Sequence, residues 1–184
     1  MTLSSTADHI AHALELKAQG NEHFKRGDYS DAIASYQQTW SFVHGRATHP
    51  ATSDELLAIT ELKLAHFSNL ALCHMKLENF ENARDSCSKA LELNADSVKC
   101  LFRRGKCHAA LGAIDDAKAD LQRVLALDAG NADARRELHA LRGAVAERRK
   151  KEVECFAGMF ERMQEEPGLP EWGGGAAASS ADGA

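Results

Sequence analysis

Valine, isoleucine and proline are scarce in this sequence. Its 184 residues include nine Val and Ile together, against 52 Leu and Ala, and only three Pro. Because β-branched residues favour strands whereas Leu and Ala favour helices, this composition excludes a β-rich fold. No proline lies between residues 51 and 166, so helices can run through that stretch. We therefore predict an all-α fold.

The signals of membrane and export proteins are also missing. No apolar run approaches the roughly 18–20 residues that span a bilayer, so we expect no membrane insertion. The first residues, MTLSSTADHI, have neither the basic nor the apolar region of a secretory signal. The five cysteines are odd in number and form no CxxC pair. We expect reduced thiols in a cytoplasmic protein, with the nucleus as the alternative.

Nucleic-acid binding and catalysis find no support either. The formal net charge of −5 argues against general binding to nucleic acid or an anionic membrane. There is no nucleophile elbow, P-loop or glycine-rich nucleotide motif. The sequence has nine histidines, but no pair of them is accompanied by a third ligand at a spacing typical of metal sites. We predict that the protein is not an enzyme and has no cofactor and no metal.

Turn-forming residues divide the chain into helical segments. Thr52 and Glu55 have the spacing of a capping box at a helix start. The last helix should run to about Glu166, where Pro167 stops it. The tail 167–184 is rich in Gly, Ala and Ser, and we expect it to be flexible. The other breaks are Gly27-Asp28, Gly45 to Pro50, Asn79, Asn94 to Asp96, Gly112, and Asp128 to Asn131.

Three segments of the chain repeat one pattern. They are GNEHFKRGDYSDAIASYQQTW from Gly20, ALCHMKLENFENARDSCSKAL from Ala71 and GKCHAALGAIDDAKADLQRVL from Gly105. Small residues recur inside them at Ala32, Ala83 and Ala117. The last two are 34 residues apart, and the first two are 51 apart, which is 34 plus a 17-residue insertion.

This 34-residue helix–turn–helix period resembles the tetratricopeptide repeat (TPR), although Thr39 stands where Ala is usual and no repeat ends in Pro. The resemblance implies three repeats in a right-handed superhelical stack over residues 7–128, with the insertion at about 45–61. Residues 1–6 would form an N-terminal tail and 129–166 a capping helix. The first helix of each repeat would line a concave groove.

Five polar residues on the predicted first helices can face that groove together. Lys17 and Asn21 are four residues apart, as are Lys99 and Arg103, so each pair shares a helix face. Asn69 lies between them on the first helix of the second repeat. Three cations and two amides in one groove favour an anionic partner, such as a chain terminus with an adjacent acidic side chain.

The five residues resemble the carboxylate clamp of chaperone-binding TPR domains, position by position. In that family the clamp binds the C-terminal Glu-Glu-Val-Asp of heat shock protein 90 and heat shock protein 70. The resemblance implies that Phe24 and Leu72 line an apolar pocket for the penultimate Val. The alternative for these two residues is a place in the core, which is usual for apolar residues at helical spacing.

Three further segments resemble the C-terminal half of large immunophilins, which are prolyl isomerases that act as co-chaperones. They are HFSNLALCHMKL at 66–77, KCLFRRGKCHAALG at 99–112 and ECFAGMFERM at 154–163. About a dozen residues precede the first repeat, too few for an isomerase domain, so we do not expect that activity.

We therefore expect a non-catalytic co-chaperone or adaptor that binds the C-terminus of heat shock protein 90, heat shock protein 70 or both. The alternative is a scaffold or targeting adaptor that acts through the convex face or the terminal helix. Residues 141–162 carry a basic cluster followed by Phe156 and Phe160, a pattern of calmodulin targets that the corresponding immunophilin region shares. For this segment we favour a capping helix whose apolar stripe packs on the third repeat.

Overall fold

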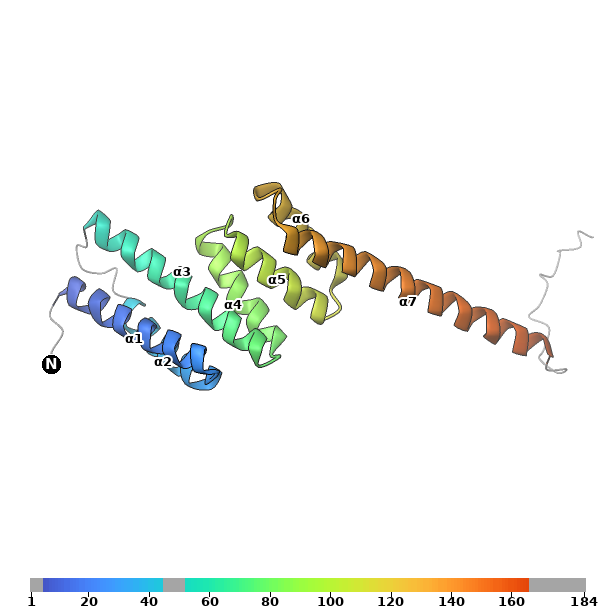
Figure 1. Ribbon diagram of the computed structural model, residues 1–184, viewed down its shortest axis with the longest axis horizontal. Helices are drawn as coiled ribbons and strands as arrows, with labels where there is room; N and C mark the ends of the chain where they lie inside the picture. The colour runs from blue at the N-terminus through green and yellow to red at the C-terminus, as the bar shows by residue number, and fades with distance from the viewer. Residues whose placement is uncertain (1–4, 45–51, 166–184) are drawn as a thin grey trace, which may run out of the picture. The chain divides into compact units, whose positions relative to one another are not determined.

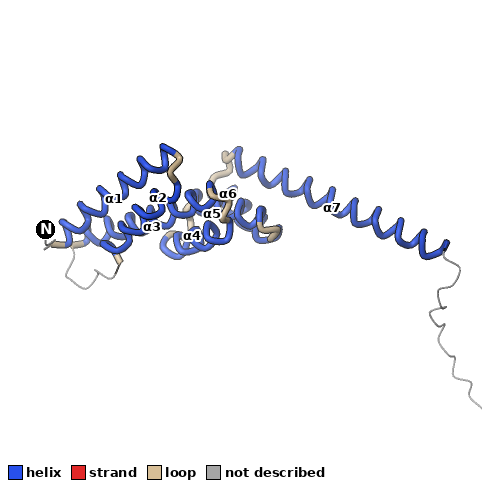
Figure 2. Tube along the Cα trace, turned by 90° about the horizontal axis from the view of Figure 1, so that it is seen from below, coloured by secondary structure: helices blue, strands red, loops and turns tan. Residues whose placement is uncertain are grey.

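The computed structural model describes residues 5–44 and 52–165, and these residues form seven α-helices and no strand (Figures 1 and 2). The all-α prediction is confirmed. The predicted tail 167–184, the residues 1–4 and the part of the insertion at 45–51 lie outside the described residues. The helices are α1 (Thr6–Arg26), α2 (Tyr29–Val43), α3 (Ser53–Lys76), α4 (Phe80–Leu93), α5 (Val98–Ala110), α6 (Ile114–Leu127) and α7 (Ala132–Glu165).

The helix boundaries follow the local sequence signals. The capping box predicted at the start of α3 is present: Glu55 N donates to Thr52 Oγ1 at 3.3 Å, and Thr52 N donates to Glu55 Oε2 at 2.8 Å. Ser5 and Asp8 form a second capping box at the start of α1. Since α3 begins at Ser53, the second half of the predicted insertion lengthens this helix to 24 residues.

The turn inside each repeat uses a left-handed backbone conformation. Gly27 has φ 87° and Gly112 has φ 77°, and glycine adopts such values without strain. The equivalent residue of the second repeat, 51 residues after Gly27 and 34 before Gly112, is Glu78 with φ 56°. The second repeat therefore keeps the left-handed turn although it lacks the glycine that adopts this conformation without strain.

Consecutive helices pack in pairs, and the pairs stack on one another. α1 contacts α2, α3 contacts α4, and α5 contacts α6, while α3 also contacts α1, α2 and α5 (Figure 1). The first helices of the pairs, α1, α3 and α5, are thus neighbours. This arrangement is the stack of three helix pairs that the repeat predicts.

Small residues stand where the two helices of a pair touch. All six predicted positions are buried: Gly20, Ala71, Gly105, Ala32, Ala83 and Ala117. The closest approach is at Gly20, where an added Cβ would lie 2.5 Å from Cε1 of Tyr36. A side chain larger than glycine at this position would displace the Tyr36 ring.

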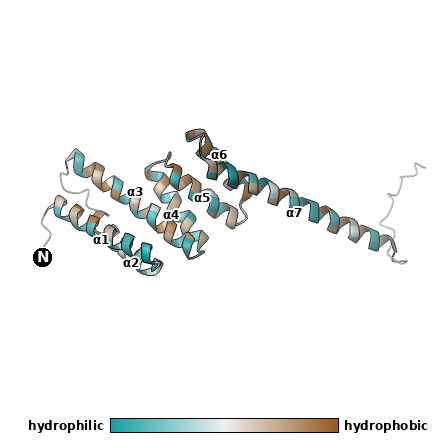
Figure 3. Ribbon diagram, viewed as in Figure 1, coloured by the Kyte–Doolittle hydropathy of each residue, from teal (hydrophilic) through white to brown (hydrophobic). Residues whose placement is uncertain are grey.

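The start of α7 covers the third helix pair. Ala134, Leu138 and Leu141 are buried in one cluster with Leu101 of α5 and Leu121 of α6. The structure divides after Leu141 into a second unit that begins at Arg142. Hydrophobic and hydrophilic residues are interspersed along α7 (Figure 3).

The second unit carries exposed apolar residues on α7. Phe156 is 67 % exposed and Phe160 is 63 % exposed, and Val153 and Met159 are also exposed. Packing of this apolar stripe on the third repeat stays a prediction.

By length and hydropathy alone, α3 could cross a membrane, and it is the one such helix among the described residues. Its apolar character has a structural cause, because α3 lies between α1, α2, α4 and α5 and buries Ile59, Leu62 and Leu70 against them.

Candidate peptide-binding site

Four of the five predicted clamp residues line one cavity on the face formed by α1, α3 and the start of α5. The cavity has a volume of about 360 Å³. Lys17 and Asn21 come from α1, Asn69 comes from α3, and Lys99 comes from the first turn of α5. The remaining lining residues are Glu61, Leu64, Ala65, Ser68 and Ser97.

The two lysines of this cavity are available for a ligand. Lys17 is half-buried and Lys99 is exposed. Within residues 5–44 and 52–165, neither has a hydrogen-bond or ion-pair partner closer than 4 Å. Glu61 lines the same cavity but lies eight residues before Asn69, which is about 12 Å along the helix. With two lysines against one glutamate among its lining residues, the cavity carries a net positive charge.

The Asn21 amide has a fixed orientation. The Tyr36 hydroxyl donates to Asn21 Oδ1 at 2.8 Å, and Asn69 Nδ2 donates to the same oxygen at 3.5 Å. Since the oxygen already accepts two hydrogen bonds, the amide NH₂ group of Asn21 is left to contact a ligand. Both asparagines can therefore donate to a carboxylate.

Arg103, the fifth predicted residue, is held at the edge of a second cavity. Its Nη1 donates to the Ser68 carbonyl oxygen at 2.6 Å and to Ser68 Oγ at 2.7 Å. Ser68 lines the first cavity, so this contact joins the two. The second cavity has a volume of about 500 Å³ and is lined by Leu72, Met75, Lys76, Phe80, Phe102, Arg103, Lys106 and Ala110.

The two residues predicted for the apolar pocket lie in different surroundings. Leu72 lines the second cavity. Phe24 instead packs against the buried cluster of Ala32, Tyr36, Leu70 and Cys73, with its ring centroid 5.3 Å from that of Tyr29, and it lines neither cavity. Of the two, Leu72 lies on a cavity wall, together with Met75 and Phe102.

Sequence reasoning missed Tyr36 and Ser68, the residues that orient the clamp side chains. Tyr36 is in α2 and is 2 % exposed, so its position in the repeat pattern indicates only a core residue. Ser68 precedes Asn69 on the same helix, and the sequence signal for it is a hydroxyl next to a predicted site residue. Neither partner could be deduced, because both contacts cross between helices.

A third and larger cavity, of about 530 Å³, lies between α2 and α4 with α3 at its base. Aromatic rings line it: the centroid of Trp40 lies 4.9 Å from those of His66 and Phe67. His66 Nδ1 lies 2.8 Å from the Tyr36 carbonyl oxygen, to which it donates. Burial lowers the pKa of His66 to about 4, so this histidine is neutral at pH 7.

One group of side chains in the described residues has the ligand spacing of a metal site. The ligand atoms of His23, Asp28 and Asp31 lie within 4.8 Å of one another. Arg26 occupies the same place, with Nη2 3.4 Å from His23 Nδ1 and Nε 3.9 Å from Asp28 Oδ2. Since the guanidinium already supplies the positive charge there, we assign no metal to this group.

Three stacked helix pairs, of which the last two are 34 residues apart and the first two are separated by 34 residues plus an insertion, are typical of a TPR domain. Two family models, each described as tetratricopeptide repeat, match residues 66–97 and 99–130. The chain belongs to the tetratricopeptide-repeat family.

The relatives place the chain within this family. It is homologous to the TPR domain of FKBP-type immunophilins, and it is 36 % identical over 162 residues to peptidyl-prolyl cis-trans isomerase FKBP4 of Mus musculus. That match covers 88 % of this chain and 35 % of FKBP4, so the chain spans about a third of the length of the curated relatives it matches.

Two solved structures show the same fold. The C-terminal TPR-containing domain of a putative FK506-binding protein from Plasmodium falciparum has a TM-score of 0.72 and 25 % identity, with 80 % of this chain and 97 % of that chain covered. The first TPR of Spaghetti (RPAP3), bound to the HSP90 peptide SRMEEVD, has a TM-score of 0.60 and 30 % identity, with 73 % and 93 % covered.

Proposed function

We propose that this chain is a cytoplasmic co-chaperone or adaptor that binds the free C-terminal Glu-Glu-Val-Asp of heat shock protein 90, heat shock protein 70 or both. One observation carries the proposal: Lys17, Asn21, Asn69 and Lys99 surround one cavity, and neither lysine is paired among the described residues. The similarity to a TPR domain bound to an HSP90 peptide supports it. We also propose that the chain has no catalytic activity.

The mechanism follows from the hydrogen-bonding groups of the site. Lys17, Asn21 and Asn69 hold the terminal carboxylate, since all three offer N–H donors to one cavity. Lys99 and Arg103 hold an acidic side chain and backbone carbonyl oxygens further along the peptide. The apolar side chain between them enters the second cavity beside Leu72. The peptide binds extended, because its contacts lie along three neighbouring helices.

A short peptide bound in this way should have micromolar affinity, or about −8 kcal/mol. Both lysines are accessible to solvent, so added salt should weaken the attraction between opposite charges. Raising ionic strength from 0.05 to 0.5 M shortens the Debye length roughly threefold. We expect a several-fold loss of affinity over that range.

Calorimetric titration with SRMEEVD and its C-terminally amidated form tests the proposal. The free acid should bind, the amide should not, and both Lys99→Ala and Arg103→Ala should abolish binding. Lys89→Ala is the matched control, because Lys89 lines the third cavity, and it should leave binding unchanged. Failure of the free acid to bind would overturn the proposal. A second titration with SGPTIEEVD compares the HSP70 terminus.

The exposed residues of α7 favour a second function, which is binding of calmodulin by residues 141–162. A basic cluster, Arg148 to Lys151, precedes the exposed Phe156 and Phe160, and calmodulin targets combine such charges with apolar anchors at helical spacing. Calmodulin should retain the chain on a native gel with Ca²⁺ and not with a chelator. Phe156→Ala with Phe160→Ala should prevent this and leave SRMEEVD binding intact. Equal retention of the double variant would contradict the assignment.

A further inference from the structure

Tyr36 contributes to the site without reaching the ligand. We infer that Tyr36 is a positioning residue whose hydroxyl makes the site selective for a free carboxylate over an amide at the peptide terminus. The inference rests on the proposed function, since it concerns the same cavity. It goes further by assigning the selectivity to a residue of α2, outside the three helices that line the cavity.

The first step is the state of the Asn21 side chain. An asparagine amide can present either its carbonyl oxygen or its NH₂ group to a ligand, depending on rotation of the terminal group. Here the oxygen accepts from the Tyr36 hydroxyl at 2.8 Å and from Asn69 Nδ2 at 3.5 Å. Turning the amide around would place its NH₂ against Asn69 Nδ2. The Tyr36 hydroxyl could then only accept from Asn21, which would leave the hydroxyl proton without a partner among the described residues. Tyr36 thereby keeps the donor side of Asn21 toward the ligand.

The second step is that Tyr36 itself is immobilised. Its side chain is buried against α1 at Gly20, where no Cβ would fit beside the ring. Its backbone carbonyl accepts a hydrogen bond from His66 at 2.8 Å. Burial also raises the pKa of Tyr36 to about 12, so the hydroxyl keeps its proton at any physiological pH. The hydroxyl therefore keeps the proton that it donates to Asn21.

The third step concerns the ligand. With Asn21 fixed, the groups that meet the peptide terminus are N–H donors from Lys17, Asn21 and Asn69. A carboxylate accepts from all of them, whereas a terminal amide must bring its own NH₂ against a donor and leave it unpaired. If the Tyr36 hydroxyl is absent, the Asn21 amide can rotate and offer its oxygen to that NH₂. The free-acid preference should then shrink.

The test is the ratio of amide to free-acid dissociation constants for SRMEEVD, measured by calorimetry with the full chain. Tyr29→Phe is the matched control, because Tyr29 is the other of the two tyrosines and its ring packs in a tilted arrangement against Phe24. In the wild-type chain and in Tyr29→Phe we expect the amide to bind at least about 100-fold more weakly than the acid. In Tyr36→Phe we expect this ratio to fall below about 10.

The readout separates positioning from general destabilisation. Loss of structure would weaken the binding of both peptides alike and leave the ratio of their dissociation constants unchanged. An unchanged ratio in a folded Tyr36→Phe chain therefore overturns the inference. If the wild-type chain binds neither peptide, the proposed function fails and the inference fails with it. A second measurement needs no variant: the free acid should shift the NMR signals of the Asn21 side-chain NH₂ more than the amide does. Equal shifts would also overturn the inference.

Discussion

Arg103 Nη1 donates two hydrogen bonds to Ser68, at 2.6 Å to its carbonyl oxygen and at 2.7 Å to its hydroxyl. The two residues are 35 positions apart, on α5 and α3. This contact fixes one edge of the guanidinium against α3 and leaves Nε and Nη2 for other partners. A long cationic side chain is thereby ordered before any ligand arrives, which lowers the entropy cost of binding.

Ser68→Ala should weaken the binding of SRMEEVD about three- to ten-fold, because it removes one of the two contacts that order Arg103. The carbonyl contact remains, so binding should persist. Ser88→Ala is the control, since the Ser88 hydroxyl bonds within α4 to the Arg84 carbonyl. Calorimetry measures both variants. Equal affinity of Ser68→Ala and the wild-type chain would show that Arg103 needs no such support.

Glu78→Gly should stabilise the fold by about 1 kcal/mol. The residue follows the end of α3 with φ 56°, where an L-amino acid with a side chain is strained. Its negative charge near a helix C-terminus is also unfavourable. Urea unfolding followed by circular dichroism measures the free energy of unfolding.

The control for this prediction is Glu81→Gly, which places glycine in the first turn of α4. That variant should lose stability, by up to about 1 kcal/mol. If Glu78→Gly also lost stability, the left-handed turn of the second repeat would not be a source of strain.

The free energy of unfolding should fall as the pH is lowered from about 7 to 4. Burial lowers the pKa of His66 from 6.5 to about 4, so the unfolded chain binds a proton in this interval and the folded chain does not. The stabilisation is complete above pH 6.5 and is lost as the pH falls toward 4. The loss from this residue should be about 2 kcal/mol between pH 7 and pH 5.

Urea unfolding at several pH values measures this dependence. His66→Gln, which cannot take up a proton, should show a smaller decrease. Burial also lowers the pKa of His74, so part of the decrease should remain in the variant. An identical pH dependence of the variant and the wild-type chain would contradict the assignment to His66.

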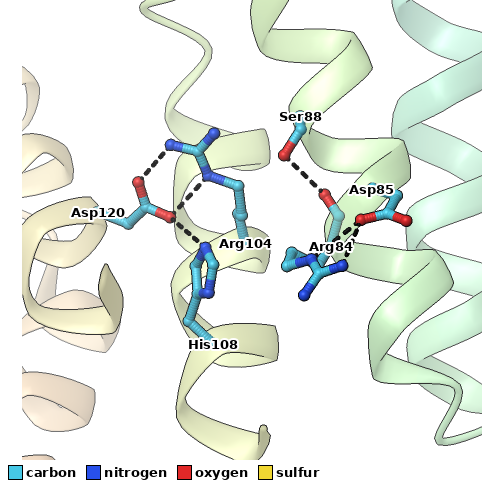
Figure 4. A network of polar contacts seen from close by, with 6 residues as sticks. All are labelled: Arg84, Asp85, Ser88, Arg104, His108 and Asp120. Atoms are coloured by element: carbon cyan, nitrogen blue, oxygen red, sulfur yellow. Dashed lines mark hydrogen bonds and ion pairs between the residues drawn. The ribbon is translucent and has the colours of Figure 1, made fainter. Parts of the chain in front are cut away.

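Asp120→Ala should be strongly destabilising. The Asp120 carboxylate accepts from Arg104 Nε at 2.8 Å and Nη2 at 2.6 Å, and His108 Nε2 lies 3.9 Å away (Figure 4). The Asp120 side chain is 8 % exposed, so its loss leaves Arg104 desolvated without its partner. We expect a loss of about 2–4 kcal/mol.

Asp115→Ala is the matched control on the same helix. Asp115 is fully exposed and pairs with Lys118 at 3.4 Å, so its removal should change stability by less than about 0.5 kcal/mol. Thermal unfolding of both variants measures the difference in their stability. Similar melting temperatures for the two would mean that solvent reaches the Arg104 pair more freely than its burial indicates.

The fold was largely predictable because its signals are local. Gly27, Gly112 and the Thr52–Glu55 capping box each act within one turn of chain, and the structure ends or begins helices at them. The small residues at Gly20 and Ala32 recur at the equivalent positions of the other two repeats, which predicted the helix pairs. The boundary between the two units, after Leu141 of α7, was not predictable from helical periodicity, because the helix continues across it.

The site was predictable only in its outline. Helical periodicity could place Lys17 with Asn21 and Lys99 with Arg103, and four of the five residues do line one cavity. Periodicity does not specify contacts between helices. It therefore could not show that the half-buried Phe24 packs against Tyr29, nor that Tyr36 and Ser68 hydrogen-bond to Asn21 and Arg103 of the predicted site.

The hydrogen bond from Tyr36 to Asn21 has a consequence for protein engineering. Grafting only the ligand-facing residues of α1, α3 and α5 onto another repeat scaffold would transfer the visible site without the hydroxyl that orients it. A graft that carries Asn21 together with this hydroxyl needs the complete pair of α1 and α2, with Gly20 retained so that the tyrosine ring fits.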